Sequence, residues 1–166
     1  MNWLRTILDG IFMSAVFNLA TGLILAFDPV IFTTAYPKEL QKIAPKNPKA
    51  PKHKLLFTLL VIAPVLLFGV FSAYEAGIRG FRYLFWTAYV EFFLVNLGDF
   101  FGLDCYLRAK LGTRWELPDT HGHPCYKTSV WMKSLGIPEH WILWPFVICP
   151  MFALLSAVLG LLLAHL

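Results

Sequence analysis

Residues 83–103 have the sequence YLFWTAYVEFFLVNLGDFFGL, an apolar and aromatic run whose only charged residues are Glu91 and Asp99. A helix needs about 20 such residues to cross the roughly 30 Å hydrocarbon core of a bilayer. Backbone polar groups in lipid must be paired within their own segment, which favours a helix over an open strand. We therefore predict a membrane-spanning helix at residues 83–103 with two carboxyl groups inside it.

Three other stretches have the same length and character. They cover residues 7–27, 55–74 and 141–164, and Asp9 is the only charged residue among them. The first is longer than the 7–15-residue core of a signal peptide, so we expect it to be retained as a helix. The fold class predicted for residues 1–166 is therefore all-α: a single polytopic membrane domain, built as a bundle of four transmembrane helices.

The composition of the chain agrees with lipid as its main solvent. Of its 166 residues, 58% are hydrophobic and 14% are charged, whereas a soluble domain has about 45–50% apolar and 25% charged residues. This composition excludes a disordered chain and a small secreted disulfide scaffold. It also offers no basic surface stripe, so we expect the bilayer and not a nucleic acid as partner.

Basic residues are distributed unevenly between the predicted loops. Residues 28–54 contain six lysines and residues 104–140 contain five Lys and Arg, against Arg5, Arg79 and Arg82 elsewhere. Cytoplasmic loops carry the excess of basic residues. We predict that both larger loops are cytoplasmic and that both termini are not. The six lysines are either this topology signal alone or also a patch for anionic lipid headgroups.

The segment 104–140 carries most of the varied polar chemistry. Its glycines and prolines divide it into short pieces, and it is too small for an independent domain. We predict that it folds back as a cytoplasmic cap on the bundle.

The third predicted span carries the strongest functional signal. Ionisable residues inside a membrane are costly, face the bundle interior and often mark function. At 100° per residue, Glu91 shares a face with Gly98 and Gly102, whose spacing permits close helix approach. Asn96 and Asp99 extend this polar arc on one flank.

The predicted spans contain no Lys, Arg or His to neutralise these carboxyl groups. The groups must therefore be protonated, hydrogen-bonded, paired with an inward-folded loop cation or bound to a cation. Their alternative role is structural, as hydrogen bonds that hold helices together. The candidate ligand-binding residues are Glu91, Asn96, Asp99, Asp104 and Asn18.

A second constellation lies in the predicted cap, where His121, His123 and Cys125 alternate after Asp119. Imidazole, thiolate and carboxylate are ordinary zinc ligands. The spacing fits none of the usual zinc motifs, and a fourth ligand would have to be recruited. We therefore favour no metal site, with these four residues as the candidates if one exists.

Residues 99–104 and the later Leu117–Tyr126 sequence LPDTHGHPCY resemble a region of small bacterial four-span membrane proteins of unassigned function. The resemblance covers only part of residues 99–126. It implies a bacterial inner-membrane protein and implies no activity.

Three functions stay open on the sequence. The first is an integral membrane protein that binds a small ligand, lipid headgroup, ion or proton at the polar site of the third span. The second is an accessory membrane protein without chemistry of its own, acting as a homo-oligomer or beside a partner subunit. The third is a membrane enzyme that combines Asp99 and Asp104 with the loop histidines His121 and His123.

Overall fold

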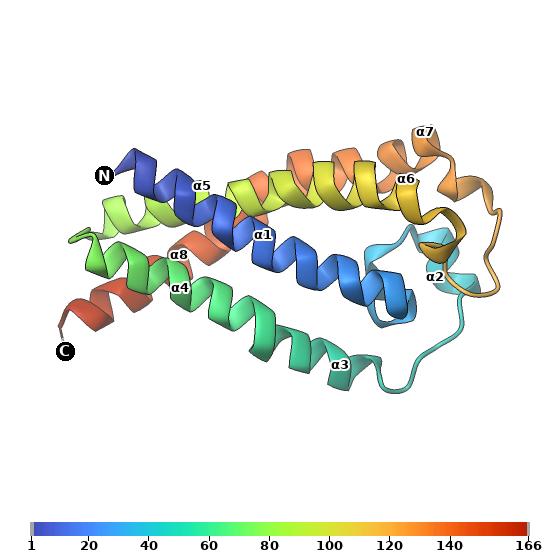
Figure 1. The fold of residues 1–166 in the computed structure, drawn as a ribbon, viewed down its shortest axis with the longest axis horizontal. Helices are drawn as coiled ribbons and strands as arrows, with labels where there is room; N and C mark the ends of the chain where they lie inside the picture. Colours follow the sequence, from blue (N-terminus) through green and yellow to red (C-terminus); the bar gives the residue numbers. More distant parts are fainter. Residues whose placement is uncertain (1, 166) are drawn as a thin grey trace.

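The computed structural model describes residues 2–165 and is helical throughout its regular elements. Within this range, four helical segments are long and apolar enough to cross a membrane. They run side by side along the long axis, with both chain ends at one end of the bundle and α2, α6 and α7 at the other (Figure 1). The four segments are Trp3–Phe27, Ala50–Glu75, Phe81–Arg114 and Thr128–Ala164.

We call these four helical segments rods. Only the first rod is one unbroken α-helix, and each of the other three contains at least one π-helical segment. The first is α1 (Trp3–Phe27), and the second comprises α3 (Ala50–Phe57), η2 (Thr58–Ile62) and α4 (Ala63–Glu75). The third comprises α5 (Phe81–Gly98), η3 (Asp99–Leu107), α6 (Arg108–Leu111) and the 3-10 turn η4 (Gly112–Arg114). The fourth comprises α7 (Thr128–Trp131), η6 (Met132–Gly136), η7 (Glu139–Ile148) and α8 (Cys149–Ala164).

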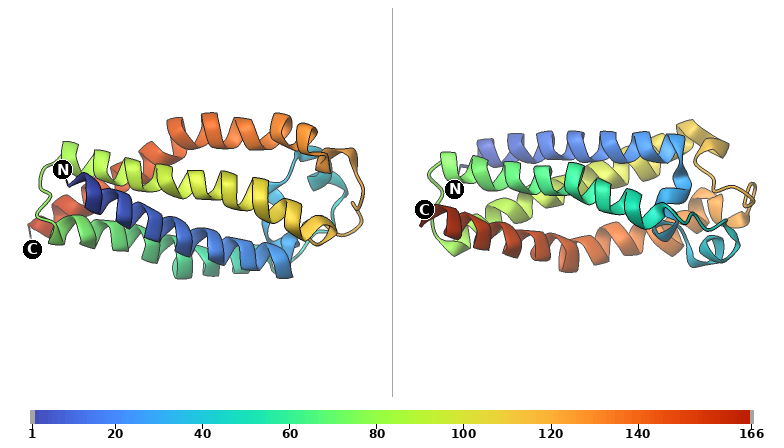
Figure 2. Two further views of the ribbon diagram at one scale, coloured as in Figure 1. Left: turned by 45° about the horizontal axis from the view of Figure 1, so that its top comes forward. Right: turned by 90° about the horizontal axis from the view of Figure 1, so that it is seen from below.

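Three prolines lie beside or inside the π-helical segments of the rods. Pro64 follows η2, Pro145 lies inside η7 and Pro150 opens α8. Proline has no N–H and its ring crowds the preceding turn, so a wider turn accommodates it. The rods bend but continue (Figure 2).

Several predicted boundaries differ from the structure, and two of them differ by more than ten residues. The third rod continues past Leu103 to Arg114, and the fourth begins at Thr128 and not at Trp141. Hydropathy marks the lipid-length apolar run, whereas the helix extends into flanking residues that also favour helical backbone. Much of segment 104–140 is therefore rod and not cap, and Glu139 and His140 lie inside the fourth rod.

The cap closes the end of the bundle with residues from both larger loops. It contains η1 (Pro29–Ala35), α2 (Lys38–Ile43) and η5 (Pro124–Tyr126). Tyr36 is 2% exposed and its hydroxyl donates to the Trp115 carbonyl at 2.7 Å. Burial raises the pKa of Tyr36, which keeps this phenol a protonated donor.

Close helix contact occurs at one of the two predicted glycines. A Cβ atom on Gly98 would collide with Ser14 Oγ of α1 and lie 2.5 Å from Asn18 Nδ2. A Cβ on Gly102 would meet nothing within 4 Å. The difference arises because η3 begins at Asp99, and its wider turns move later residues off the face predicted at 100° per residue.

Large apolar side chains cover the outside of the rods. Leu4 is 70% exposed, Phe146 75% and Leu60 71%, and many others on all four rods are also exposed. A soluble monomer rarely exposes so much contiguous apolar surface. These faces suit contact with lipid.

Candidate ligand site at the capped end of the bundle

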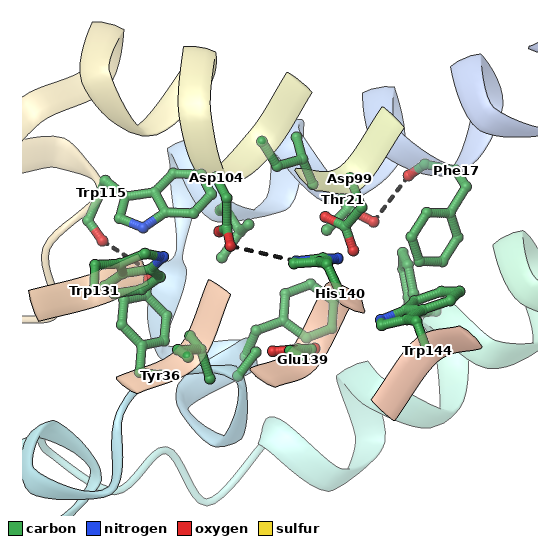
Figure 3. Close-up of a pocket in the computed structure, with 16 residues that line it drawn as sticks. Phe17, Thr21, Tyr36, Asp99, Asp104, Trp115, Trp131, Glu139, His140 and Trp144 are labelled. Carbon is green, nitrogen blue, oxygen red and sulfur yellow. Dashed lines mark hydrogen bonds and ion pairs between the residues drawn. The ribbon is translucent and has the colours of Figure 1, made fainter. Parts of the chain in front are cut away.

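A cavity of about 180 Å³ lies where the cap meets the bundle, and residues from all four rods line it. Its polar lining comprises Asp99, Asp104, Glu139, His140, Thr21 and Tyr36. Its walls are mostly aromatic, and Figure 3 shows the rings of Phe17, Trp115, Trp131 and Trp144 around the acidic side chains. Mostly apolar walls with a few converging polar groups are typical of small-ligand sites.

His140 is the centre of the polar network. It is 3% exposed, and its Nδ1 lies 2.7 Å from Asn96 Oδ1. Its Nε2 lies 3.3 Å from Asp104 Oδ2. Figure 3 marks this pair with a dashed line. The imidazole of the fourth rod thus connects two side chains of the third rod.

Asn96 also satisfies a backbone group that Pro145 leaves unpaired. In the i→i+5 register of η7, the carbonyl of His140 would pair with the nitrogen of residue 145, which in proline carries no hydrogen. Asn96 Nδ2 donates to this carbonyl at 2.9 Å. A buried carbonyl without a partner is costly, so the amide and the proline belong to one local arrangement.

The orientation of the Asn96 amide determines which nitrogen of the His140 ring carries a hydrogen. Because Nδ2 donates to the His140 carbonyl, Oδ1 faces the ring and accepts a hydrogen from Nδ1. The second ring nitrogen, Nε2, is left to face Asp104. The 3.3 Å between Nε2 and Asp104 Oδ2 is within ion-pair distance.

The cavity is unbalanced in charge. Three carboxyl groups line it, and among its described lining residues none is Lys or Arg. The nearby Arg108 is engaged elsewhere, because its guanidinium donates to the Tyr126 carbonyl and to Thr128 Oγ1 and lies over the Trp131 ring. Arg108 therefore fastens the cap to the third rod, and His140 alone provides a basic group to the site.

The structure brings some predicted site residues together and separates others. Asp99 and Asp104 line the cavity, and Asn96 contacts it through His140. Asn18 donates to Val95 O at 3.2 Å and to Ser14 Oγ at 3.1 Å, so it joins α1 to α5.

Glu91 lies apart from this site. It is 1% exposed, as its predicted face required, and one of its oxygens has no hydrogen-bond partner. A Cβ on Gly69 would lie 2.8 Å from the other oxygen, which shows how closely α4 approaches. Glu91 is not among the residues that line the capped cavity, whereas Asp99, eight residues further along the third rod, is.

The loop histidines make hydrogen bonds with neighbours in their own loop. His121 Nδ1 lies 3.2 Å from Glu116 Oε2, and His123 Nδ1 accepts from the Cys125 backbone N–H within its own turn. Asp119 is exposed, with a positive φ of 62°. Among residues 2–165, no three His, Cys, Asp or Glu side chains are arranged to hold a metal. The hydrogen bonds of His121 and His123 are thus local to their own loop, and a site that combines Asp99 and Asp104 with these histidines stays a prediction.

Sequence reasoning missed the role of Glu139 and His140. Both precede Trp141, where the predicted span began, and were assigned to the cap. The sequence contains a signal for both residues. Glu139 and His140 lie five and four residues before Trp144, so the helix predicted from Trp141 can be extended upstream to include them.

Comparison with protein-family models, with curated proteins and with solved structures found no match to the chain. The resemblance of residues 99–126 to small bacterial membrane proteins stays a prediction.

Proposed function

We propose that this chain is an integral, multi-pass membrane protein that binds a small cationic ligand, an amine or quaternary ammonium group, in the capped cavity. The observation that carries the proposal is the lining itself. Asp99, Asp104 and Glu139 face an aromatic-walled space in which His140 is the one basic group among the described lining residues.

A cation solves the electrostatic problem of this cavity. Ionised carboxylates lose hydration when they are removed from water and need a partner charge or a proton. Even with His140 protonated, three ionised carboxyl groups would leave the lining negative. A bound ammonium group supplies the missing positive charge without moving the rods.

The aromatic walls favour an organic cation over a bare metal ion. Phe17, Trp115 and Trp144 line the cavity together with other aromatic rings. The face of such a ring attracts cations, and cages of this kind recognise quaternary ammonium groups. A volume of about 180 Å³ exceeds the 150 Å³ of an engineered cavity that holds benzene, so a trimethylammonium group has room.

Membrane insertion is supported by the length of the four rods and by their apolar outer faces. The uneven distribution of basic residues supports a cytoplasmic position for the capped end and therefore for the site. The shared chemistry is an ammonium group, which either a lipid headgroup or a free amine would supply.

The test compares choline with its uncharged carbon analogue 3,3-dimethyl-1-butanol, by calorimetric titration of the purified protein in an uncharged detergent. We expect saturable binding of choline, at least tenfold weaker binding of the neutral analogue, and loss of choline binding in Asp99→Asn. The matched control is Glu75→Gln, which removes an exposed carboxylate at the opposite end of the bundle. Equal binding of both compounds, or full binding by Asp99→Asn, would overturn the proposal.

A further inference from the structure

A second cavity adjoins the capped one. It has a volume of about 200 Å³ and shares the lining residues Phe17, Glu139 and Trp144 with the first cavity. Its remaining lining residues are all apolar and include Ile62, Val65 and Ile148. An acidic, aromatic chamber and a hydrocarbon-like chamber therefore meet at the same three side chains.

The shared side chains form the partition between the two chambers. The rings of Phe17 and Trp144 pack edge to face with centroids 6.4 Å apart. The Glu139 side chain lines both chambers and lies beside His140 in the fourth rod (Figure 3). In a ligand that extends from one chamber to the other, the charged group would lie near the Glu139 carboxylate. Its apolar part would lie against the rings of Phe17 and Trp144.

Residues from all four rods line the apolar chamber. Ile62 and Val65 come from the second rod, and Leu143 and Ile148 come from η7 of the fourth. Leu143, one of the residues that line this chamber, is 44% exposed at the surface of the bundle. The second rod diverges from the first at the capped end (Figure 1). In a bilayer, this side of the chamber would face lipid.

We infer that the ligand is a single-chain amphiphile whose ammonium head occupies the capped cavity and whose hydrocarbon chain occupies the second cavity. This inference rests on the proposed function for its charged half. The lining residues that the two chambers share favour a ligand with a hydrocarbon chain, because a free small amine would use only the first chamber. The amphiphile enters laterally from the lipid between η2 and η7.

The size of the apolar chamber sets an expected chain length. A cavity of 150 Å³ holds the six carbons of benzene, so 200 Å³ accommodates about six to eight carbons. Each methylene removed from water strengthens binding about fourfold. Affinity should therefore rise with chain length and level off once the chamber is full.

The experiment measures binding of tetramethylammonium and of butyl-, hexyl- and octyltrimethylammonium to the whole protein in lipid nanodiscs. Binding to empty nanodiscs is subtracted. We expect octyltrimethylammonium to bind at least a hundredfold more tightly than tetramethylammonium. Two variants, Leu143→Trp and Ile148→Phe, fill the apolar chamber from residues outside the acidic one. Both should lose most of the chain-length effect and keep wild-type binding of tetramethylammonium.

The control is Leu154→Trp, an exposed position of α8 that lines neither chamber. It should keep the full chain-length effect, and thermal melting checks that each variant is folded. Tetramethylammonium binding without a chain-length effect, or an effect undiminished in both filled variants, would overturn the inference and leave the cation site standing with a free amine as its ligand. Failure of tetramethylammonium to bind would overturn the proposed function, and the inference with it.

Discussion

The side-chain amide of Asn96 holds His140 at two points: its Nδ2 donates to the His140 carbonyl at 2.9 Å, and its Oδ1 accepts from the ring Nδ1 at 2.7 Å. The two groups come from different rods and are both buried. This double contact fixes the position of the fourth rod against the third and aims the other ring nitrogen at Asp104.

The first prediction concerns this contact. Asn96→Leu leaves the His140 carbonyl and Nδ1–H without partners, so we expect a loss of about 1–3 kcal/mol in the free energy of unfolding. Denaturation followed by circular dichroism in detergent measures the change. Adding Pro145→Ala restores a backbone N–H that can reach the His140 carbonyl and should recover part of this loss.

The comparison that matters is the double variant. If Pro145→Ala relieves nothing in the Asn96→Leu background, the carbonyl is not paired in the way the structure indicates. Pro145→Ala alone provides the baseline, because with Asn96 present the carbonyl already has its donor.

The second prediction compares two glycines four residues apart. Gly98→Ala places a methyl group against Ser14 and Asn18 of α1, so overpacking should cost about 1–3 kcal/mol. Gly102→Ala meets nothing within 4 Å and should be neutral or stabilising by about 0.5–1 kcal/mol, since alanine favours helix. Melting temperatures of the two variants test this prediction, and we expect the lower value for Gly98→Ala. Equal values would contradict the packing described for Gly98.

The four apolar helices and the burial of Glu91 could be predicted because both depend on local properties of the chain. A run of about 20 apolar residues is visible in the sequence, and an ionisable residue within it must face inward. The burial of Asn96 does not follow from this repeat, because at 100° per residue Asn96 lies about 140° from Glu91.

The joining of His140 to Asp104 could not be predicted in the same way. It requires the fourth rod to begin at Thr128, well before the apolar run, and it requires the wider turns of η3 and η7 to bring the two side chains together. Neither hydropathy nor a 100° repeat contains this information. The aromatic walls likewise come from residues distant in sequence, such as Phe17 and Trp115.

The third prediction concerns orientation in the membrane. Cysteines placed at exposed Lys46 and at exposed Thr113 report the capped end of the bundle, and a cysteine at exposed Glu75 reports the opposite end. Cys105 is replaced by serine, while Cys125 and Cys149 are buried. From the uneven distribution of basic residues we expect a membrane-impermeant maleimide to label only Glu75→Cys in intact bacterial cells. Labelling of Lys46→Cys or Thr113→Cys before lysis would reverse the orientation.

The fourth prediction separates Glu91 from the ligand site. Glu91→Gln keeps the shape of the side chain, and the residue lies outside the lining of the capped cavity. We therefore expect choline titration to give wild-type affinity in Glu91→Gln, in contrast to Asp99→Asn. Gly69→Ala, whose Cβ would lie 2.8 Å from a Glu91 oxygen, should lower the melting temperature without weakening choline binding in the folded protein. A loss of choline affinity in Glu91→Gln, with its melting temperature unchanged, would show that Glu91 acts in the site after all and that the two ends of the third rod are coupled.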